Sequence, residues 1–486
     1  MRFGTEDVQS LAEDLNVMDT KTKTFFILLI MILGGAFSAS VAEGKGADSV
    51  SVMSGPAGDT ARMNLKECVD YAMEHSYKMM IQRLANDDRR LDERDAYLSF
   101  LPSISASIGG QASFGRNIDP ETNIYTTTTS FSNSYGVSGG MYVFNGFKIV
   151  NNYKIAKTAR ALGYEETQQL KDEIALAVIQ AYYNVLYNEK MLALTQAQLD
   201  ASQANLELVA KEYELGRKSL ADKSDIEAEV AEYSYNLVKQ RNALESSYIT
   251  LREAMQYPYS EPLAIETGTG DDAELNLMAD KESIVSTAKD RLPAARIAEY
   301  NIRTAKASFN SAKWSLLPSI SLSGGYSTGY NALAGAGAAN SPFWAQMKNL
   351  QGQYVGVSIS IPVFNGLYQQ SEIGRKRNAW RKAQWEYEAK MLEIESEVTR
   401  AVADMEGAAK EWLSAQKRLE ARKISHAQSE KRFANGMISA IELQTNTNLL
   451  LEAQATLLNA LYQYNIKSMV VRYYSGIPYA DQLNQE

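Results

Sequence analysis

The sequence contains very few of the residues that catalytic and metal sites require. Among its 486 residues there is one cysteine, Cys68, and there are two histidines, His75 and His426. A single cysteine cannot form an internal disulfide or a thiolate metal site, and two distant histidines are a poor basis for a zinc site. The net charge of −9 argues against general binding to nucleic acid, because phosphate backbones attract basic surfaces. We therefore expect no enzymatic activity, no metal, no cofactor and no nucleic-acid partner.

The start of the chain predicts export. Residues 25–37 form an apolar run that is too short to cross a bilayer, for which about 20 residues are needed. Lysines precede this run and small residues follow it up to Ala42, which is typical of a secretory signal peptide. We expect residues 1–42 to be an N-terminal extension plus signal peptide, with translation beginning at Met18, and residues 43–62 to be flexible. No later segment has about 18 consecutive apolar residues, so no transmembrane helix is expected.

Three short motifs occur twice in the chain, in the same order. The first copies and their counterparts are Leu101-Pro102-Ser103 and Leu317-Pro318-Ser319, Phe144-Asn145-Gly146 and Phe364-Asn365-Gly366, and Gly216 with Ser219 and Gly436 with Ser439. The members of each pair are 216, 220 and 220 positions apart. We therefore expect two structural repeats, over residues 63–262 and 281–480, joined by a connector over 263–280.

Both repeats are expected to contain very long helices. No proline occurs between Pro120 and Pro258 or between Pro362 and Pro478, and apolar residues within these intervals recur in steps of three and four. This spacing is typical of coiled coils, although an ordinary long helical hairpin would also produce it. In each repeat we expect one helix before the strands. After the strands we expect long helices over 146–213 and 366–434, followed by return helices over 219–256 and 439–475. Trp380 and Trp385 are expected to pack between helices, and paired acids such as Glu165 and Glu166 to lie on solvated faces.

Four segments alternate between apolar residues and small polar residues. They are residues 103–116, 134–145, 319–328 and 354–364. Alternation with period two gives a strand one apolar face and one face of serine and glycine. A length of about 10–12 residues is typical of tilted membrane strands, whereas soluble strands usually have about 5–6. The stretches between paired strands, 117–133 and 328–353, are expected to be surface loops.

Four strands cannot close a membrane barrel by themselves. Open sheet edges cannot face lipid, and single-chain barrels need at least about eight strands. Two copies would give a barrel filled by side chains, three would give twelve strands and an open lumen, and a tetramer is not excluded. The predicted fold class is therefore an α+β membrane protein, in which a long coiled-coil helical barrel continues into a transmembrane β-barrel with four strands per protomer. We favour a homotrimer in contact with outer-membrane lipid.

Glycines mark the expected turns. Gly216 and Gly436 can adopt the left-handed conformation that ends a helix, and Ser219 and Ser439 can then cap the returning helices. Asn-Gly pairs are typical of tight hairpins, but here a helical pattern follows them. Strand-to-helix junctions are therefore predicted at two pairs of residues, Asn145-Gly146 and Asn365-Gly366.

Together, the doubled Leu-Pro-Ser motif, the junction over residues 362–366 and the doubled turns at Gly216 and Gly436 resemble the TolC family of outer-membrane efflux and secretion channels. The resemblance covers roughly residues 63–480. It implies a passive trimeric exit duct in the cell outer membrane, with a helical tunnel in the periplasm, docked to a periplasmic adaptor protein and an inner-membrane transporter. The implied function is that of the exit channel of a tripartite efflux system. A type I protein-secretion outlet and a non-conducting coiled-coil surface scaffold are the alternatives.

The resemblance also implies candidate gate residues. In that family, acidic residues just after the second turn ring the closed periplasmic end, and Glu442 occupies the first of these positions while Thr445 occupies the next. A solvated residue at a helix start is the alternative interpretation of Glu442. The family's basic and aromatic hydroxyl latch residues are replaced by Ile438 and Phe433.

Gate closure is therefore expected to use other contacts near the turns. The candidates are Asp222, Asp225, Arg217 and Lys218. The four turn residues Gly216, Ser219, Gly436 and Ser439 are expected to contact the adaptor.

Overall fold

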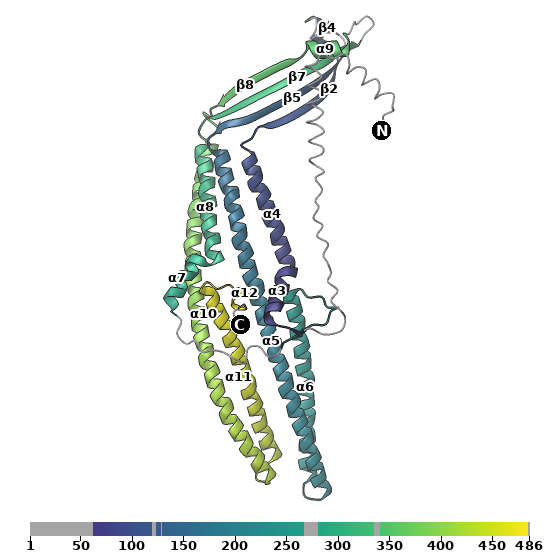
Figure 1. Ribbon diagram of the computed structural model, residues 1–486, viewed down its shortest axis with the longest axis vertical. Coiled ribbons are helices and arrows are strands. Elements are labelled where there is room, and N and C mark those ends of the chain that lie inside the picture. The colour runs from purple at the N-terminus through teal and green to yellow at the C-terminus, as the bar shows by residue number, and fades with distance from the viewer. Residues whose placement is uncertain (1–61, 119–122, 128, 267–279, 335–340, 485–486) are drawn as a thin grey trace. The chain divides into compact units, whose positions relative to one another are not determined.

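The computed structural model describes residues 62–118, 123–127, 129–266, 280–334 and 341–484 (Figure 1). The predicted signal peptide, the segment that follows it up to residue 61 and most of the predicted connector lie outside these residues. Among the described helices, none combines the length and the apolar character that crossing a membrane requires.

The first half of the chain contains a short strand, two helices, a pair of long strands and two long helices (Figure 1). These elements are β1 (Arg62–Met63), α3 (Leu65–His75), α4 (Tyr77–Leu98), β2 (Ser103–Ser113), β3 (Arg116–Ile118), β4 (Tyr125–Thr127), β5 (Thr129–Asn145), α5 (Lys148–Glu214) and α6 (Leu220–Met255).

The second half has the same general order of elements. It comprises β6 (Ala264–Ile265), α7 (Lys281–Arg291), α8 (Pro293–Trp314), β7 (Ser319–Ala334), α9 (Phe343–Asn349), β8 (Gly352–Ser360), α10 (Tyr368–Ala434), α11 (Ala440–Tyr474) and the short α12 (Tyr479–Gln482). The helices α5 and α10 have 67 residues each and form antiparallel hairpins with α6 and α11 (Figure 1).

The helix predicted before the strands of each repeat is in fact two helices. Ser76 separates α3 from α4 and has an extended backbone with ψ of 123°. Leu292 separates α7 from α8 and has ψ of 138°. Leu292 precedes Pro293, and proline disfavours the helical conformation of the residue before it, which explains the second break.

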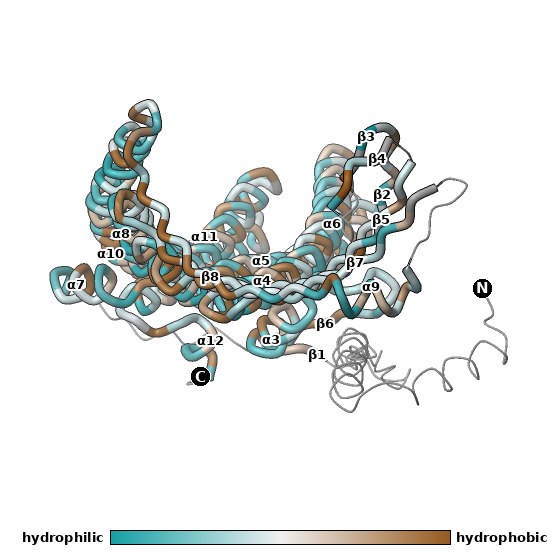
Figure 2. The backbone as a smooth tube through the Cα atoms, turned by 90° about the horizontal axis from the view of Figure 1, so that it is seen from above, coloured by the Kyte–Doolittle hydropathy of each residue, from teal (hydrophilic) through white to brown (hydrophobic). Residues whose placement is uncertain are grey.

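The four long strands form one antiparallel sheet in the order β2-β5-β7-β8. Its register places apolar residues opposite one another, for example Ala106 opposite Val137, and Leu322 opposite both Met141 and Val357. The sheet therefore has one apolar face and one face of small polar residues, and the alternation along the strands can be followed in Figure 2.

The ends of the strands differ from those predicted. β2 ends at Ser113 instead of residue 116, and β8 spans Gly352–Ser360 instead of 354–364, since Pro362 lacks the N–H that a ladder needs. β5 and β7 are longer than predicted because their pairing continues out to Thr129 and Ala334. The expectation that 117–133 and 328–353 are only surface loops was wrong, because these stretches also contain the β3–β4 hairpin and α9.

Two apolar cores lie at the middle of the long helices. In the first, the buried residues of α5 from Ile174 to Leu186 pack against α3, the end of α6 and α11. In the second, the buried residues of α10 from Met391 to Ala409 pack against α7, the start of α8 and α11. Helix α11 contributes to both cores and thereby connects the two halves of the chain.

Candidate functional site

The polar face of the sheet carries no charge and mostly small side chains, with Gln111 and Tyr354 as larger exceptions. Its rows include Ser103, Gly140, Ser323 and Gly356 on successive strands, and the hydroxyl oxygens of Ser105 and Ser138 lie 3.3 Å apart. Within β2, β5, β7 and β8 the sequence contains no Asp, Glu, Lys, Arg or His. This face can hydrogen-bond to water or to polar solutes, and it offers no fixed charge that would select among ions.

The opposite face and both edges of the sheet are exposed in the single chain. Ile108 is 81% exposed on β2, and Val355 is 84% exposed on β8. Large apolar residues exposed to this degree on one face of a sheet mark a surface that contacts lipid or another protein. The strands β2 and β8 are the two edges, so their outer backbone groups are available for pairing with further strands.

Left-handed residues join the strands to the long helices. Gly146 and Phe147 have φ of 62° and 57° between β5 and α5, and Gly366 and Leu367 have φ of 67° and 63° before α10. Asn145 ends β5, and its side-chain oxygen accepts the N–H of Ile149 at 3.2 Å. A Cβ atom at Gly146 would collide with the carbonyl oxygen of Trp314, so only glycine fits there.

The first helix turn is built from Gly216 and Ser219. Gly216 has φ of 72°, and the N–H of Arg217 donates to the carbonyl of Glu212 at 2.8 Å, which closes the end of α5. The hydroxyl of Ser219 accepts the N–H of Asp222 at 3.1 Å, and the Asp222 carboxylate accepts the N–H of Ser219 at 2.9 Å. The Ser219 hydroxyl also donates to the Asp222 carboxylate at 2.7 Å. This bond, together with the one from the Ser219 N–H, holds the pKa of Asp222 below its usual value, so the carboxylate serves to cap α6.

The second turn repeats this backbone but uses its acid differently. Gly436 has φ of 68°, and the N–H of Met437 donates to the carbonyl of Arg432 at 2.8 Å. The hydroxyl of Ser439 accepts the N–H of Glu442 at 3.2 Å. The Glu442 carboxylate, 52% exposed, lies 3.9 Å from the Arg432 guanidinium instead of completing a capping box. Glu442 therefore extends its charge away from the cap, whereas Asp222 does not.

The two turns and the helices that follow them contact each other. The Lys218 ammonium lies over the Phe433 ring, 5.3 Å from its centre. Farther along, the Tyr233 hydroxyl donates to the Asn448 side chain at 3.2 Å, and Gln444 donates to Glu232 at 3.3 Å.

The sequence analysis treated Lys218 as a candidate gate contact and Phe433 as a replaced latch residue. The structure brings these two residues into contact. Arg217 and Asp225 lie exposed near the first turn. The α6–α11 hydrogen bonds were not predicted, because no local pattern marks which polar residues of two hairpins face each other.

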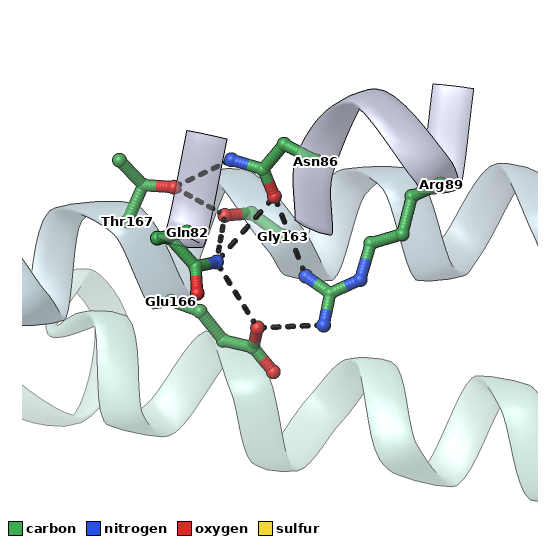
Figure 3. Close-up of polar contacts among 6 residues, drawn as sticks. All are labelled: Gln82, Asn86, Arg89, Gly163, Glu166 and Thr167. Atoms are coloured by element: carbon green, nitrogen blue, oxygen red, sulfur yellow. Dashed lines mark hydrogen bonds and ion pairs between the residues drawn. The ribbon is translucent and has the colours of Figure 1, made fainter. Parts of the chain in front are cut away.

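A polar cluster fixes α4 against α5 (Figure 3). The Arg89 guanidinium pairs with the Glu166 carboxylate at 2.7 Å, and Asn86 donates to the Thr167 hydroxyl at 2.7 Å. A Cβ atom on Gly163 would collide with Asn86, so this glycine allows the close approach of the two helices. The prediction of a solvated acidic face was wrong for Glu166, because its partner on α4 lies far away in the sequence.

One carboxyl group is buried in the middle of α5. Asp172 is 7% exposed and accepts a hydrogen bond from Gln168 at 3.3 Å and another from Tyr473. Burial raises the pKa of Asp172 to about 7, although these two hydrogen bonds oppose the shift. Within the described residues, His, Cys, Asp and Glu side chains form no group of three or more that could hold a metal ion.

Comparison with known proteins places these features in context. The family model described as "Outer membrane efflux protein" matches residues 74–255 and 284–476. The Outer membrane protein TolC of Vibrio cholerae is 25% identical over 326 residues, which are 64% of this chain and 68% of that protein. The Escherichia coli protein of the same name is 22% identical over 336 residues, and the chain spans 64% of its length. The solved structure of CusC, described as forming a transmembrane channel, has a TM-score of 0.72 at 17% identity, covering 87% of this chain and 95% of CusC.

Proposed function

The chain belongs to the outer membrane efflux protein family, and from this membership we propose that three copies form a passive conduit through the outer membrane. Proteins of this family are efflux channels of the TolC type, and this protein is located in the outer membrane. The three copies would together contribute twelve strands, which is enough to enclose an open lumen.

The observation that carries the proposal is the four-stranded sheet with two free edges and two different faces. In lipid, every backbone polar group must be hydrogen-bonded, so β2 and β8 require partners on their outer edges. Pairing of β8 of one copy with β2 of the next satisfies both edges and closes the wall. The apolar face then meets lipid, and the serine and glycine face lines the water path.

The helical hairpins supply the periplasmic part of the proposed conduit. Their turns at Gly216 and Gly436 lie about 100 Å of helix away from the strands, since α5 and α10 have 67 residues each at about 1.5 Å per residue. A periplasmic adaptor would contact these turns, including the caps Ser219 and Ser439, and an inner-membrane transporter would supply the energy. Cargo for this conduit is an exported solute, and transport of a secreted polypeptide is the second use of the same pore.

Three copies of Glu442 would place a ring of carboxylates at the periplasmic entrance, with Asp222 and Asp225 nearby. Such a ring attracts cations and repels anions. The uncharged strands make this test sharper, because no residue of β2, β5, β7 or β8 adds a fixed charge to the ion selectivity.

The experiment is single-channel recording of the purified protein in planar bilayers. We expect stable conductance with a preference for cations, and a smaller preference in Glu442→Gln. The matched control is Glu442→Asp, which retains the charge and should retain most of the preference. Silence from folded trimers would refute the conduit and favour a coiled-coil scaffold, whereas unchanged selectivity in Glu442→Gln would refute only the position of Glu442 at the entrance.

A further inference from the structure

The short helix α9 is attached to the end of β7 that lies farthest from the long helices. The ladder between β7 and β8 ends at the pair Ser327 and Gly352, while β7 itself continues to Ala334. The side chain of Gln346, only 2% exposed, takes the place of a paired strand. It accepts the N–H of Asn331 at 2.8 Å and donates to the carbonyl of the same residue at 2.9 Å, as a peptide group of a neighbouring strand would. This buried amide gives α9 a fixed position.

The ring contacts of Phe343 show which face of the sheet α9 covers. The Phe343 ring lies 6.3 Å from that of Tyr135 on β5 and 5.3 Å from that of Tyr330 on β7. Tyr135 lies two residues before Val137 and therefore on the same side of β5, and Val137 is opposite Ala106 on the apolar face. Helix α9 therefore lies against the apolar face, at the side opposite the serine and glycine residues, and Figure 2 shows it next to β7.

The composition and height of α9 fit a membrane interface. It presents Phe343, Trp344, which is 54% exposed, and Lys348 in two successive turns. From Ile320 to Tyr330 the strand rises about 34 Å, and a tilt of about 40° reduces this to about 26 Å, close to the ~25 Å apolar band of outer-membrane barrels. Aromatic side chains concentrate where such a band meets the headgroups, and lysine reaches toward anionic headgroups.

We propose that α9 is an interfacial helix that inserts Phe343 and Trp344 among the lipid headgroups of the outer leaflet and sets the depth of the sheet in the membrane. This inference rests on the proposed function, because it takes the apolar face as the lipid-facing one. The occupant is lipid instead of a second copy of the chain, because the Phe343 ring packs beside Tyr135 of β5 and Tyr330 of β7 on the apolar face. Copies of the chain meet at the edges β2 and β8 and not on this face.

The test measures tryptophan fluorescence of the full-length protein in phosphatidylcholine vesicles whose lipids carry bromine either near the headgroup or near the chain end. Relative to the natural protein, we expect Trp344→Phe to show clearly less quenching by bromine near the headgroup. Its loss of quenching by bromine near the chain end should be smaller. The matched control is Trp385→Phe, because Trp385 is 75% exposed on α10 and should contribute no lipid quenching. Gln346→Ala releases α9 from Asn331. In this variant, the difference between quenching by bromine near the headgroup and quenching by bromine near the chain end should become smaller.

Two results would overturn the assignment. If Trp344 is quenched by aqueous iodide and not by brominated lipid, α9 faces water; if neither quenches it, another copy of the chain covers it. Conductance of the same preparation separates this inference from the proposed function. Conducting vesicles with an unquenched Trp344 refute α9 as an interfacial helix alone, whereas absence of both conductance and lipid quenching of every tryptophan refutes the conduit as well.

Discussion

The buried carboxyl group of Asp172 makes the stability of the protein depend on pH in a direction that can be measured. Most folded proteins lower the pKa values of their carboxyl groups, but burial of Asp172 raises its pKa from 3.8 to about 7. Lys171 favours the charged form and Asp481 disfavours it, while Gln168 and Tyr473 donate hydrogen bonds to it. Between about pH 4 and 7 the folded chain thus holds a proton that the unfolded chain has lost.

The sign and size of the effect follow from this difference. Stability falls as pH rises wherever the folded state binds more protons, so the loss accumulates from about pH 4 to 7 and is complete above it. A shift of about three units at about 1.4 kcal/mol per unit gives about 4 kcal/mol per protomer. Asp172→Asn removes this cost, because an amide is neutral at every pH and its oxygen can still accept the bond from Gln168.

Chemical denaturation followed by far-UV circular dichroism measures the prediction. Near pH 8 we expect Asp172→Asn to be more stable than the natural protein by about 4 kcal/mol, and near pH 4 the two should be equal. The control is Asp200→Asn, since Asp200 lies exposed on the same helix and accepts a bond from Gln196 at 2.8 Å in the same i, i+4 arrangement. An Asp172→Asn variant that is less stable near pH 8, or a difference that does not change with pH, would refute the reasoning.

Three further predictions concern the junctions, the pore wall and the turns. In denaturant titrations, Gly146→Ala should destabilise the protein by about 2 kcal/mol or more, and Gly366→Ala by only about 1 kcal/mol. The reason is that a Cβ atom at Gly146 meets the carbonyl oxygen of Trp314, whereas a Cβ atom at Gly366 meets no atom. Ser105→Asp should raise the cation preference of single channels, whereas Ser105→Ala should leave it unchanged; equal selectivity in both would place Ser105 outside the lumen. Lys218→Ala removes a cation–π contact with Phe433 of about 0.5–1 kcal/mol and should therefore speed amide hydrogen exchange at both helix turns. An unchanged exchange rate at the second turn would contradict that contact.

Local sequence patterns predicted the helices and strands better than they predicted which of these elements contact each other. Long intervals without proline predicted helices over 146–213 and 366–434, and the structure has Lys148–Glu214 and Tyr368–Ala434. The later starts reflect the two left-handed residues at each junction, which the Asn-Gly motif indicated only in part. The strand ends were misjudged because the outer pairing of β5 with β7 joins residues about 200 positions apart.

Side-chain partners far apart in the sequence were the hardest features to predict. Trp380 was expected to pack between helices, and this is confirmed by its stacking on Phe309 with ring centres 5.7 Å apart. The same expectation was wrong for Trp385 within the described chain, since it is 75% exposed. Periodicity gives the face of a helix on which a residue lies, but the neighbour that covers this face is set by tertiary packing. The roles of Glu442 and of the turn residues depend on other copies and partners, and they stay predictions.

The central claim is that separate copies of the chain complete one membrane wall, and disulfide cross-linking between the sheet edges tests it most directly. Within one protomer, β5 and β7 separate the edge strands β2 and β8. At about 4.8 Å per strand spacing, these two edges lie about 14 Å apart. A disulfide within one protomer is therefore excluded, because it requires Cα atoms within ~7 Å of each other. The natural Cys68 does not interfere, because it is fully buried and burial raises its pKa to about 12. With Ser105→Cys on β2 and single cysteines scanned through Gly356, Ser358 and Ser360 on β8, the account predicts oxidised ladders that end at three linked chains. Monomers alone at every scanned position, or ladders that continue past three, would contradict it.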